Sequence, residues 1–262
     1  MRSLKILIVV VILIAIITGA VMLARGNGTK EENVFTIGLD DSYPPMGFRN
    51  EKNEIVGFDI DIANEVCEKL GMKLKLQQIT WASKENELNS GSIDCIWNGF
   101  AYNEDRAAKM TLTEPYIKGE MYFLLRNGST IKSQEELKGK KIGVQAGSIQ
   151  AQDLENSEFG KSIEMIEYRD NLTACMDLEA GGVDAVFCSN IIGNYIITDK
   201  KKDYITIPSV DITTSKGSVI AFKKGNTELR DKIQNALYEL KQEGKLTQIS
   251  EKWFGKDMVI VK

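Results

Sequence analysis

The sequence predicts an α/β protein built from two similar lobes. Strand-like apolar segments alternate with amphipathic helical segments from Val34 onward, which is typical of sheets covered by helices on both faces. One helix–turn–strand unit, Leu88–Arg106 with its strand at Ile93–Trp97, has a weaker copy at Leu178–Asn190. Ligands of open α/β sheets lie beyond the carboxyl ends of the strands. The repeat therefore predicts two lobes that share one cleft.

Residues 1–25 predict a signal peptide or a membrane anchor. Ile6–Ala24 contains no charged residue, and a helix of that length approaches the thickness of a hydrocarbon core at about 1.5 Å per residue. Arg2 and Lys5 precede it, which orients the rest of the chain outward. A cleaved signal and an uncleaved anchor both stay open as interpretations. Residues 26–33 form a polar, glycine-containing linker.

Local signals define the elements of the first lobe. Val34–Leu39 is an apolar strand, and Pro44 and Pro45 keep the following loop out of a helix because a residue before proline avoids the helical region. Residues 57–70 place apolar side chains on one helical face, and Gly71 ends that helix. A second, alternating strand follows at 72–79.

The later elements follow the same order of strand, loop and helix, which favours parallel sheets. The expected strands are Met121–Leu125, Lys141–Gln145, Val183–Phe187 and Ser218–Phe222. The expected helices are a short one before Lys141, one opening at Gly147, Asn171–Glu179, about 190–199, one capped by Thr227, and a last one carrying Trp253 and Phe254.

The chain is expected to pass between the lobes twice, near Leu124–Arg126 and near Lys216–Ser218. The predicted domains are therefore residues 34–124 together with 217–262 for the first lobe, and residues 125–216 for the second.

Composition excludes several classes of function. The net charge is −4, from 33 basic and 37 acidic residues, and no basic block indicates nucleic acid binding. The chain has no histidine, which rules out histidine triads, histidine bases and histidine metal ligands. Nothing resembles a nucleophile with its base, or two opposed carboxylates, so binding is favoured over catalysis. No metal and no cofactor is expected.

The four cysteines are predicted to be buried thiols rather than disulfides. They are Cys67, Cys95, Cys175 and Cys188, and no two of them have the CxxC spacing of zinc and thioredoxin sites. Each falls at an apolar position of a predicted helix or strand, where a free cysteine packs as a small hydrophobic residue. Cys175 and Cys188 are the first candidate pair if a disulfide forms.

Arg106 is the residue that the pattern singles out for ligand binding. Asn103 is a good helix cap, which puts Arg106 in the first turn, where a cation opposes the helix dipole by about 0.3–1 kcal/mol. Because Glu104 and Asp105 offset that effect, an ordinary surface arginine is favoured on the pattern alone. The functional alternative is a guanidinium that clamps a carboxylate with two hydrogen bonds.

Other candidate residues carry weaker signals. The helix that opens at Gly147–Gln150 offers free backbone N–H groups to an anion. Tyr43 and Trp81 lie in loops at strand ends and are equally consistent with core packing. Asp94 and Asp184 occupy the same position in the two copies of the repeat, which favours a structural role in a turn.

Five segments together resemble the extracellular solute-binding proteins of polar amino acid ABC transporters. They are GFDIDIANEVCEKLGMKL (57–74), LNSGSIDCIWNG with NEDR (88–106), TEPY (113–116), LKGKKIGVQAGS (137–148) and DLEAGGVDAV (177–186). The resemblance covers about residues 34–255. It implies a two-lobe periplasmic-binding-protein fold of type II, with two hinge crossovers, preceded here by an N-terminal hydrophobic helix.

The resemblance also implies a function. It predicts an extracytoplasmic protein, secreted or tethered by its N-terminal segment, that captures a small carboxylate, an amino acid being the expected ligand. It would deliver that ligand to the transmembrane permease of an ABC transporter, and it would not be an enzyme. Two alternatives stay open: a membrane-anchored ligand-sensing module, and a dehydratase-like enzyme that uses the same cleft.

Site residues are carried over by position. Arg106 resembles the arginine that holds the ligand's α-carboxylate, and the backbone N–H groups of Gly99, Ala101 and Ile149 would help it. Ser148 would lie at the mouth of the second lobe.

The remaining positions concern the rest of the ligand. The resemblance places Asp40, Tyr43 and Trp81 around the ligand's side chain, and Asn98 would offer its carbonyl to the ammonium group. Ser189 occupies the position that is usually an aspartate paired with the α-ammonium.

Two positions depart from the family pattern. Position 101 is usually Ser or Thr and is Ala101 here, and position 189 is Ser189 instead of aspartate. A charge-assisted hydrogen bond contributes roughly 1.5–3 kcal/mol, so the loss at 189 alone would weaken binding about tenfold or more. The hypothesis that follows is that the ligand lacks a free α-ammonium or uses another acid, such as Asp40.

Overall fold

The described part of the chain is a mixed α/β structure with two five-stranded sheets and one small three-stranded sheet. The computed structural model describes residues 33–199, 201–213 and 215–262. The strands are β1 (Val34–Leu39), β2 (Ser42–Tyr43), β3 (Gly47–Arg49), β4 (Ile55–Val56), β5 (Lys73–Gln78), β6 (Cys95–Ile96), β7 (Thr111–Leu112), β8 (Met121–Arg126), β9 (Lys141–Gln145), β10 (Glu164–Tyr168), β11 (Ala185–Ser189), β12 (Tyr204–Pro208) and β13 (Ala221–Phe222).

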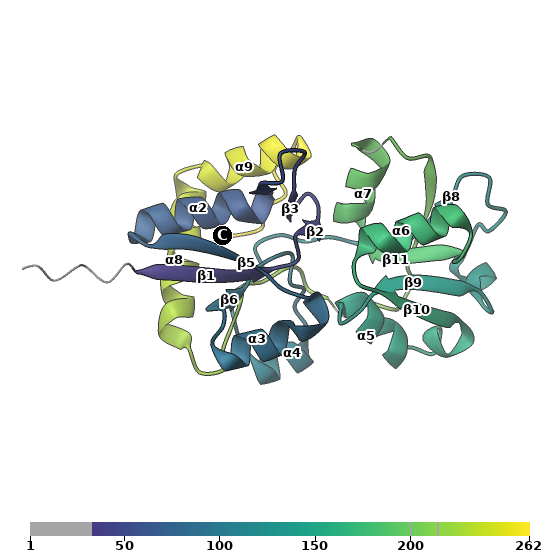
Figure 1. The fold of residues 1–262 in the computed structure, drawn as a ribbon, viewed down its shortest axis with the longest axis horizontal. Coiled ribbons are helices and arrows are strands. Elements are labelled where there is room, and N and C mark those ends of the chain that lie inside the picture. Colours follow the sequence, from purple (N-terminus) through teal and green to yellow (C-terminus); the bar gives the residue numbers. More distant parts are fainter. Residues whose placement is uncertain (1–32, 200, 214) are drawn as a thin grey trace, which may run out of the picture. The chain divides into compact units, whose positions relative to one another are not determined.

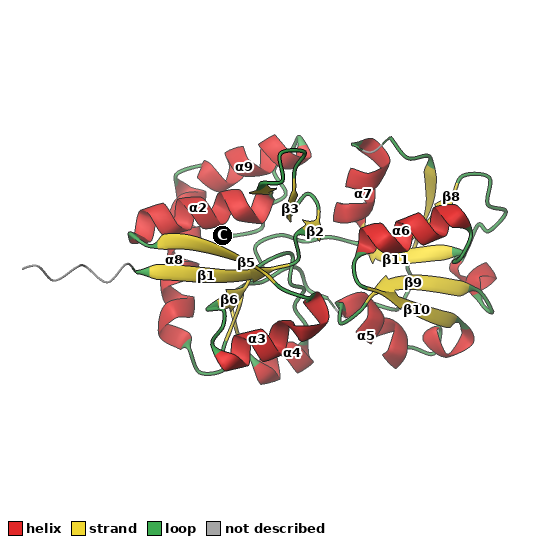
Figure 2. Cartoon of the chain, in the orientation of Figure 1, coloured by secondary structure: helices red, strands yellow, loops and turns green. Residues whose placement is uncertain are grey.

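Helices cover both faces of each large sheet (Figure 2). The α-helices are α2 (Phe58–Leu70), α3 (Lys84–Ser90), α4 (Glu104–Lys109), α5 (Ile149–Asn156), α6 (Asn171–Ala180), α7 (Asn190–Thr198), α8 (Thr227–Gln242) and α9 (Lys245–Phe254). The short 3-10 helices are η1 (Trp81–Ser83), η2 (Gln134–Leu137) and η3 (Gly160–Ser162).

The first sheet has the strand order β5-β1-β6-β13-β7 and the second β10-β9-β11-β8-β12, in separate parts of the fold (Figure 1). Side chains of successive strand residues point to opposite faces, so each sheet is packed on two sides. In β8, Phe123 and Leu125 pack against α5 on one face, while Tyr122 and Leu124 pack against α6 and α7 on the other. Separate apolar clusters likewise cover the two faces of the first sheet.

The sequence repeat corresponds to a structural repeat. Gly91 and Gly181 end α3 and α6 in the same left-handed conformation, with φ of 82° and 84°. Asp94 then accepts a hydrogen bond from the backbone N–H of Thr36 at the start of β1, and Asp184 accepts one from Lys141 at the start of β9. Each aspartate ties a turn to the neighbouring strand, which confirms the structural role expected for both.

Neither sheet is purely parallel, in contrast to the prediction. β8 runs antiparallel to β11 and β12, and β13 runs antiparallel to β6 and β7. Strands β1 and β6 are parallel, as are β9 and β11, and their carboxyl ends lie where the two sheets face each other. A strand that begins at this edge of its sheet, where the parallel strands end, must run antiparallel to them.

The chain changes sheets earlier than the predicted position. β8 pairs within the second sheet along its whole length, so the first passage lies before Met121 rather than at Leu124–Arg126. The return lies between β12 and Ser218, whose bridges to Ala101 and Ile117 belong with the first sheet.

Several boundaries differ from those predicted. The strand expected at Ile93–Trp97 is limited to Cys95–Ile96. Asp94 and Trp97, on either side of it, each donate one backbone hydrogen bond to β1. Thr227 is the first residue of α8, and Asn226 precedes it as the cap residue. Strands β10 and β12 were not predicted, since their pairing partners are distant in the sequence.

The predicted N-terminal hydrophobic helix lies outside the described residues, as does the linker up to residue 32. Across the described ranges, no helix combines the length and the apolar character needed to cross a bilayer. All four cysteines are buried free thiols, as predicted.

Replacing Leu237 by alanine should destabilise the chain by about 2–5 kcal/mol, because this side chain of α8 is fully buried in the core between α2, α9 and the first sheet. Urea unfolding followed by circular dichroism measures the change. The matched control is Met176→Ala on α6, where the side chain is 69% exposed and the change should stay within about 0.5 kcal/mol. Equal effects of the two substitutions would contradict the assigned core.

Candidate functional site

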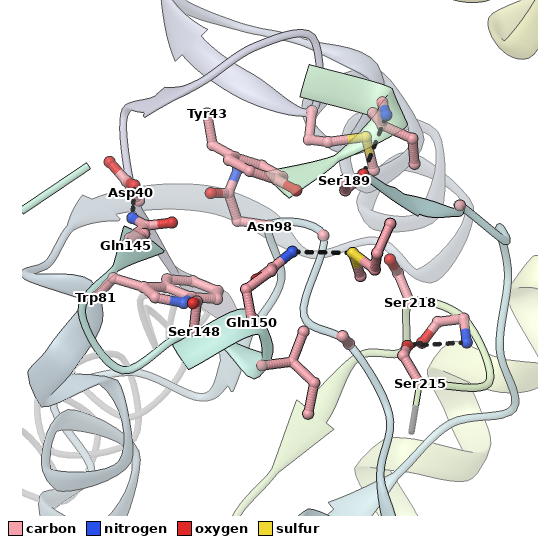
Figure 3. A pocket seen from close by; sticks show the side chains of 18 of the residues that line it. Asp40, Tyr43, Trp81, Asn98, Gln145, Ser148, Gln150, Ser189, Ser215 and Ser218 are labelled. Atoms are coloured by element: carbon pink, nitrogen blue, oxygen red, sulfur yellow. Dashed lines mark hydrogen bonds between the residues drawn. The ribbon is translucent and has the colours of Figure 1, made fainter. Parts of the chain in front are cut away.

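A cavity lies between the two large sheets, where the carboxyl ends of their parallel strands meet. All of the site residues predicted from the sequence line it: Asp40, Tyr43, Trp81, Asn98, Gly99, Ala101, Arg106, Ser148, Ile149 and Ser189. Figure 3 labels Asp40, Tyr43, Trp81, Asn98, Ser148 and Ser189 among them. Asp40 follows β1, Asn98 and Gly99 follow β6, Ser148 follows β9, and Ser189 ends β11. The fold therefore gathers residues from distant parts of the sequence at one place.

Arg106 projects into this cavity from the first turn of α4. Asn103 caps the helix by accepting the backbone N–H of Arg106 at 2.8 Å, as predicted. The guanidinium donates to the carbonyl of Ala101 at 2.7 Å and lies 4.3 Å from the centroid of the Phe100 ring. Only 4% of Arg106 is exposed, so the prediction of an ordinary surface arginine is wrong.

The charge of Arg106 is not neutralised by an ion pair within the described part of the chain, where no carboxylate oxygen lies within 4 Å of it. Burial lowers its pKa to about 10, partly offset by the more distant carboxylates of Glu85, Asp153 and Asp105. A buried guanidinium that lines a cavity is suited to bind a carboxylate.

Two backbone N–H groups lie at the same cavity. Ala101 lies opposite Ser218 in an isolated antiparallel bridge, and the hydrogen bonds of this bridge are made by the residues on either side of the two. The N–H of Ala101 itself therefore points away from Ser218. Ile149 is the first residue of α5, and Ser148 caps this helix by accepting the N–H of Ala151 at 3.1 Å. The N–H groups of Ala101 and Ile149 have no acceptor among the described residues. The N–H of Ile149 lies at the start of α5, and free N–H groups at a helix start attract anions.

Gly99 differs from its expected role. Its N–H donates to the carboxylate of Asp59 at 2.7 Å and so does not serve the cavity. Asp59 is 1% exposed, also accepts the hydroxyl of Tyr116 at 2.8 Å, and its burial raises its pKa to about 7. Asp59, in the first turn of α2, therefore fixes the loop that carries Gly99 and Ala101.

Asp40 is the carboxylate that lines the cavity, and it links the two sheets. Its two oxygens accept the side-chain N–H of Gln145 at 2.5 Å and the backbone N–H of Ser42 at 3.0 Å. Burial raises the pKa of Asp40 to about 6, with smaller contributions from the charges of Asp170 and Asp41. Gln145 ends β9, so this hydrogen bond joins the first sheet to the second.

Tyr43, Asn98 and Ser189 line the cavity as well (Figure 3). Burial raises the pKa of Tyr43, and the side chain of Ser189 partly offsets this. Ser189 caps α7 by accepting the N–H of Ile191 at 3.0 Å. In the orientation that satisfies both ends of its amide, Asn98 donates to the carbonyl of Asp40 at 3.0 Å and accepts the N–H of Gly47 at 3.1 Å.

Sequence reasoning missed several lining residues, among them Gln145, Gln150, Met46, Met121, Ser215 and Ser218. Gln145 could have been identified, because it ends a parallel strand as Ser189 does. Gln150 donates to the sulfur of Met121 at 3.2 Å, a contact that no local pattern indicates. Within the described ranges, no group of three or more histidine, cysteine, aspartate or glutamate side chains is placed to hold a metal ion.

Comparison with known proteins gives consistent results. The profile of the bacterial extracellular solute-binding proteins, family 3, matches residues 35–256. The chain is 29% identical over 234 residues to the L-cystine-binding protein TcyJ of Escherichia coli, covering 88% of this chain and 86% of that protein. It is also 29% identical to the L-arginine-binding protein of Pseudomonas aeruginosa, covering 85% and 88%.

Among solved structures, the fold is similar to an ABC uptake transporter substrate binding protein from Streptococcus pneumoniae with bound histidine. The TM-score is 0.81 at 32% sequence identity, and the match covers 87% of this chain and 95% of that one. These proteins bind solutes rather than transform them, in agreement with the prediction that the chain is not an enzyme.

The raised pKa of Asp40 predicts a pH-dependent effect of Asp40→Asn on stability. The folded-state pKa of about 6 lies above the ordinary value of 3.8, so the native chain is most stable with Asp40 protonated and loses this contribution as the pH rises through 6. The melting temperature of the variant relative to the native chain should therefore be higher at pH 8 than at pH 5. The difference corresponds to on the order of 1 kcal/mol.

Differential scanning calorimetry of both proteins at the two pH values makes the comparison. The control is Asp231→Asn, at an exposed side chain paired with Arg230. Its melting temperature relative to the native chain should be the same at both pH values. A relative melting temperature for Asp40→Asn that falls from pH 5 to pH 8 would contradict the assigned pKa.

Proposed function

This chain belongs to the bacterial extracellular solute-binding proteins of family 3, and we propose that its cavity captures a free amino acid for an ABC uptake transporter. The single observation that carries the proposal is the buried guanidinium of Arg106, which faces the cavity without a carboxylate partner among the described residues. The relatives named above bind cystine, arginine and histidine, which all carry an α-carboxylate.

The α-carboxylate would bind between the two sheets. Arg106 supplies the charge, and the N–H groups of Ala101 and Ile149 supply directed hydrogen bonds from opposite sides of the cavity. Charge-assisted hydrogen bonds in a site shielded from water are stronger than those in solvent. The carboxylate would thereby be held by groups from both halves of the fold at once.

The ammonium group has one acidic candidate partner, Asp40. Ser189 carries no charge, and Asp40 is the carboxylate among the residues that line the cavity. One oxygen of Asp40 accepts a hydrogen bond from the side-chain amide of Gln145, and the other accepts one from the backbone N–H of Ser42. Each carboxylate oxygen can accept a further hydrogen bond. We propose that a cationic group of the ligand, the α-ammonium or a basic side chain, binds there. Trp81 and Tyr43 would enclose the remaining part of the ligand.

We further propose that the two sheets are the cores of two lobes that close on the ligand by bending at the two passages between them. The predicted lobes, 34–124 with 217–262 and 125–216, hold in this proposal with the first boundary moved to before Met121. Bonds that join the sheets, such as Gln145 to Asp40 and Asn103 to Gln152, would form on closure. A ligand that contacts both halves favours the closed state over the open one.

The closed protein would dock on the transmembrane permease of its transporter. The family is extracellular or periplasmic. We propose that residues 1–25 direct the chain across the membrane and either are removed or remain as a tether, because they carry a long uncharged apolar run behind two basic residues.

Arg106→Met should weaken amino acid binding about a hundredfold or more, because it removes the charge that opposes the carboxylate. A thermal-shift screen over the common amino acids and L-cystine identifies the strongest ligand, and isothermal titration calorimetry then measures its Kd. The unliganded melting temperature should not fall, since the substitution removes a buried cation that lacks an ion pair. The control Arg126→Met, at an exposed arginine ending β8, should leave Kd within about twofold. Native-like affinity of Arg106→Met would refute the proposal.

Asp40→Asn tests the partner of the ligand's cationic group. If Asp40 binds that group, the variant should lose about tenfold or more in affinity for the amino acid and little for the deaminated carboxylate of the same size. Calorimetry of both ligands with both proteins gives the four constants needed. Retained tight binding of the amino acid by Asp40→Asn would remove Asp40 from this role, and a native preference for the deaminated acid would indicate a ligand without an α-ammonium.

A further inference from the structure

Lys84 is a buried cation next to the proposed ligand site. It is the first residue of α3, only 3% of it is exposed, and it lies outside the set of residues that line the cavity. Its ammonium donates to the carbonyl of Trp81 at 3.2 Å and to the carbonyl of Gly147 at 2.7 Å. Trp81 belongs to the first-sheet side and Gly147 follows β9 of the second sheet, so Lys84 joins the two halves.

This placement of a lysine is unfavourable for three reasons. Burial, together with the smaller effect of the nearby positive charge of Arg106, lowers the pKa of Lys84 to about 8, and the charge of Glu85 offsets part of this. The start of a helix also disfavours a cation. Within the described residues no carboxylate oxygen lies within 4 Å of Lys84, whereas buried charges in proteins are usually paired.

Lys84 and Arg106 converge on the same acceptor. Arg106 approaches the carbonyl of Gly147 at 3.5 Å, on the oxygen that Lys84 binds at 2.7 Å. Gly147 has φ of +68°, and a Cβ atom there would lie 2.9 Å from the backbone of Ala82. The loop before α5 is thus pressed against η1, and its carbonyl points at two cations. Two residues later Ile149, the first residue of α5, lines the cavity.

We propose that Lys84 is a positioning residue for the ligand's carboxylate: its bond to Gly147 holds the start of α5 over the carboxylate, and that carboxylate offsets the repulsion between Lys84 and Arg106. This inference rests on the proposed function and adds to it a residue that no cavity contact reveals. Lys84 acts through Gly147 and does not touch the ligand.

The proposal links the charge of the ligand to closure. With both halves together and no anion bound, two neighbouring cations share one carbonyl, which disfavours the closed arrangement. An anion at Arg106 removes that penalty, and the Lys84–Gly147 bond then contributes fully. Since a ligand shifts a conformational equilibrium only by its different affinity for the two states, this arrangement would make closure respond to a carboxylate rather than to any molecule that fits.

Lys84→Met tests the role, since methionine keeps an unbranched apolar chain without the ammonium. The control is Lys161→Met, an equal change of charge at a lysine whose side chain is 65% exposed. The probe is the amino acid that most stabilises the native chain among the common amino acids and L-cystine, with Kd measured by calorimetry. Lys84→Met should raise Kd about tenfold or more, and Lys161→Met less than twofold.

A second measurement separates positioning from a general structural role. The unliganded melting temperature of Lys84→Met should equal or exceed that of the native chain, because a buried cation without an ion pair has been removed. A fall of several degrees in the unliganded protein would mean that Lys84 is structural, which overturns the proposal. A Kd within twofold of native would overturn it as well.

Arg106→Met distinguishes failure of this inference from failure of the proposed function. If Arg106→Met abolishes binding while Lys84→Met leaves Kd unchanged, the function stands and the role of Lys84 falls. If the native chain binds none of the amino acids, both fall together.

Discussion

The structure depends on holding the Arg106 guanidinium away from water without giving it a counter-ion among the described residues. Arg106 is fixed by the Asn103 cap, the Ala101 carbonyl and the ring of Phe100, none of which carries charge. Burying a cation in this way opposes folding, and a protein retains it only where the charge has a use. The surrounding loop is fixed in turn by Asp59, whose buried carboxylate holds Gly99.

Hydrogen bonds and like-charge repulsion act against each other at the boundary between the two sheets. Polar side chains reach across it, as Gln145 does to Asp40 and Lys84 to Gly147, and these bonds favour contact between the halves. The like charges of Lys84 and Arg106 at the same place act against that contact. In the proposed closure, a bound anion would shift this balance toward contact between the halves, and loss of the anion would shift it back.

Local patterns were sufficient to predict the repeat and the Asn103 cap. The family resemblance, rather than any local pattern, indicated most of the residues that line the cavity. Local patterns work because capping, glycine stops and strand ends are properties of a few neighbouring residues. They were not sufficient for the burial of Arg106, the use of the Gly99 N–H by Asp59, or the antiparallel course of β8. Each of these is decided by a partner far away in the sequence, and Lys84 shows the same limit: nothing near it indicates that it meets Gly147.

The central claim is that an anion joins the two halves at Arg106. A crystal structure of the chain with its strongest amino acid ligand tests this most directly, by locating the ligand's carboxylate. We predict carboxylate oxygens within hydrogen-bonding distance of the Arg106 guanidinium and of the N–H groups of Ala101 and Ile149. A ligand bound with its carboxylate elsewhere, or in contact with one half only, would contradict the account.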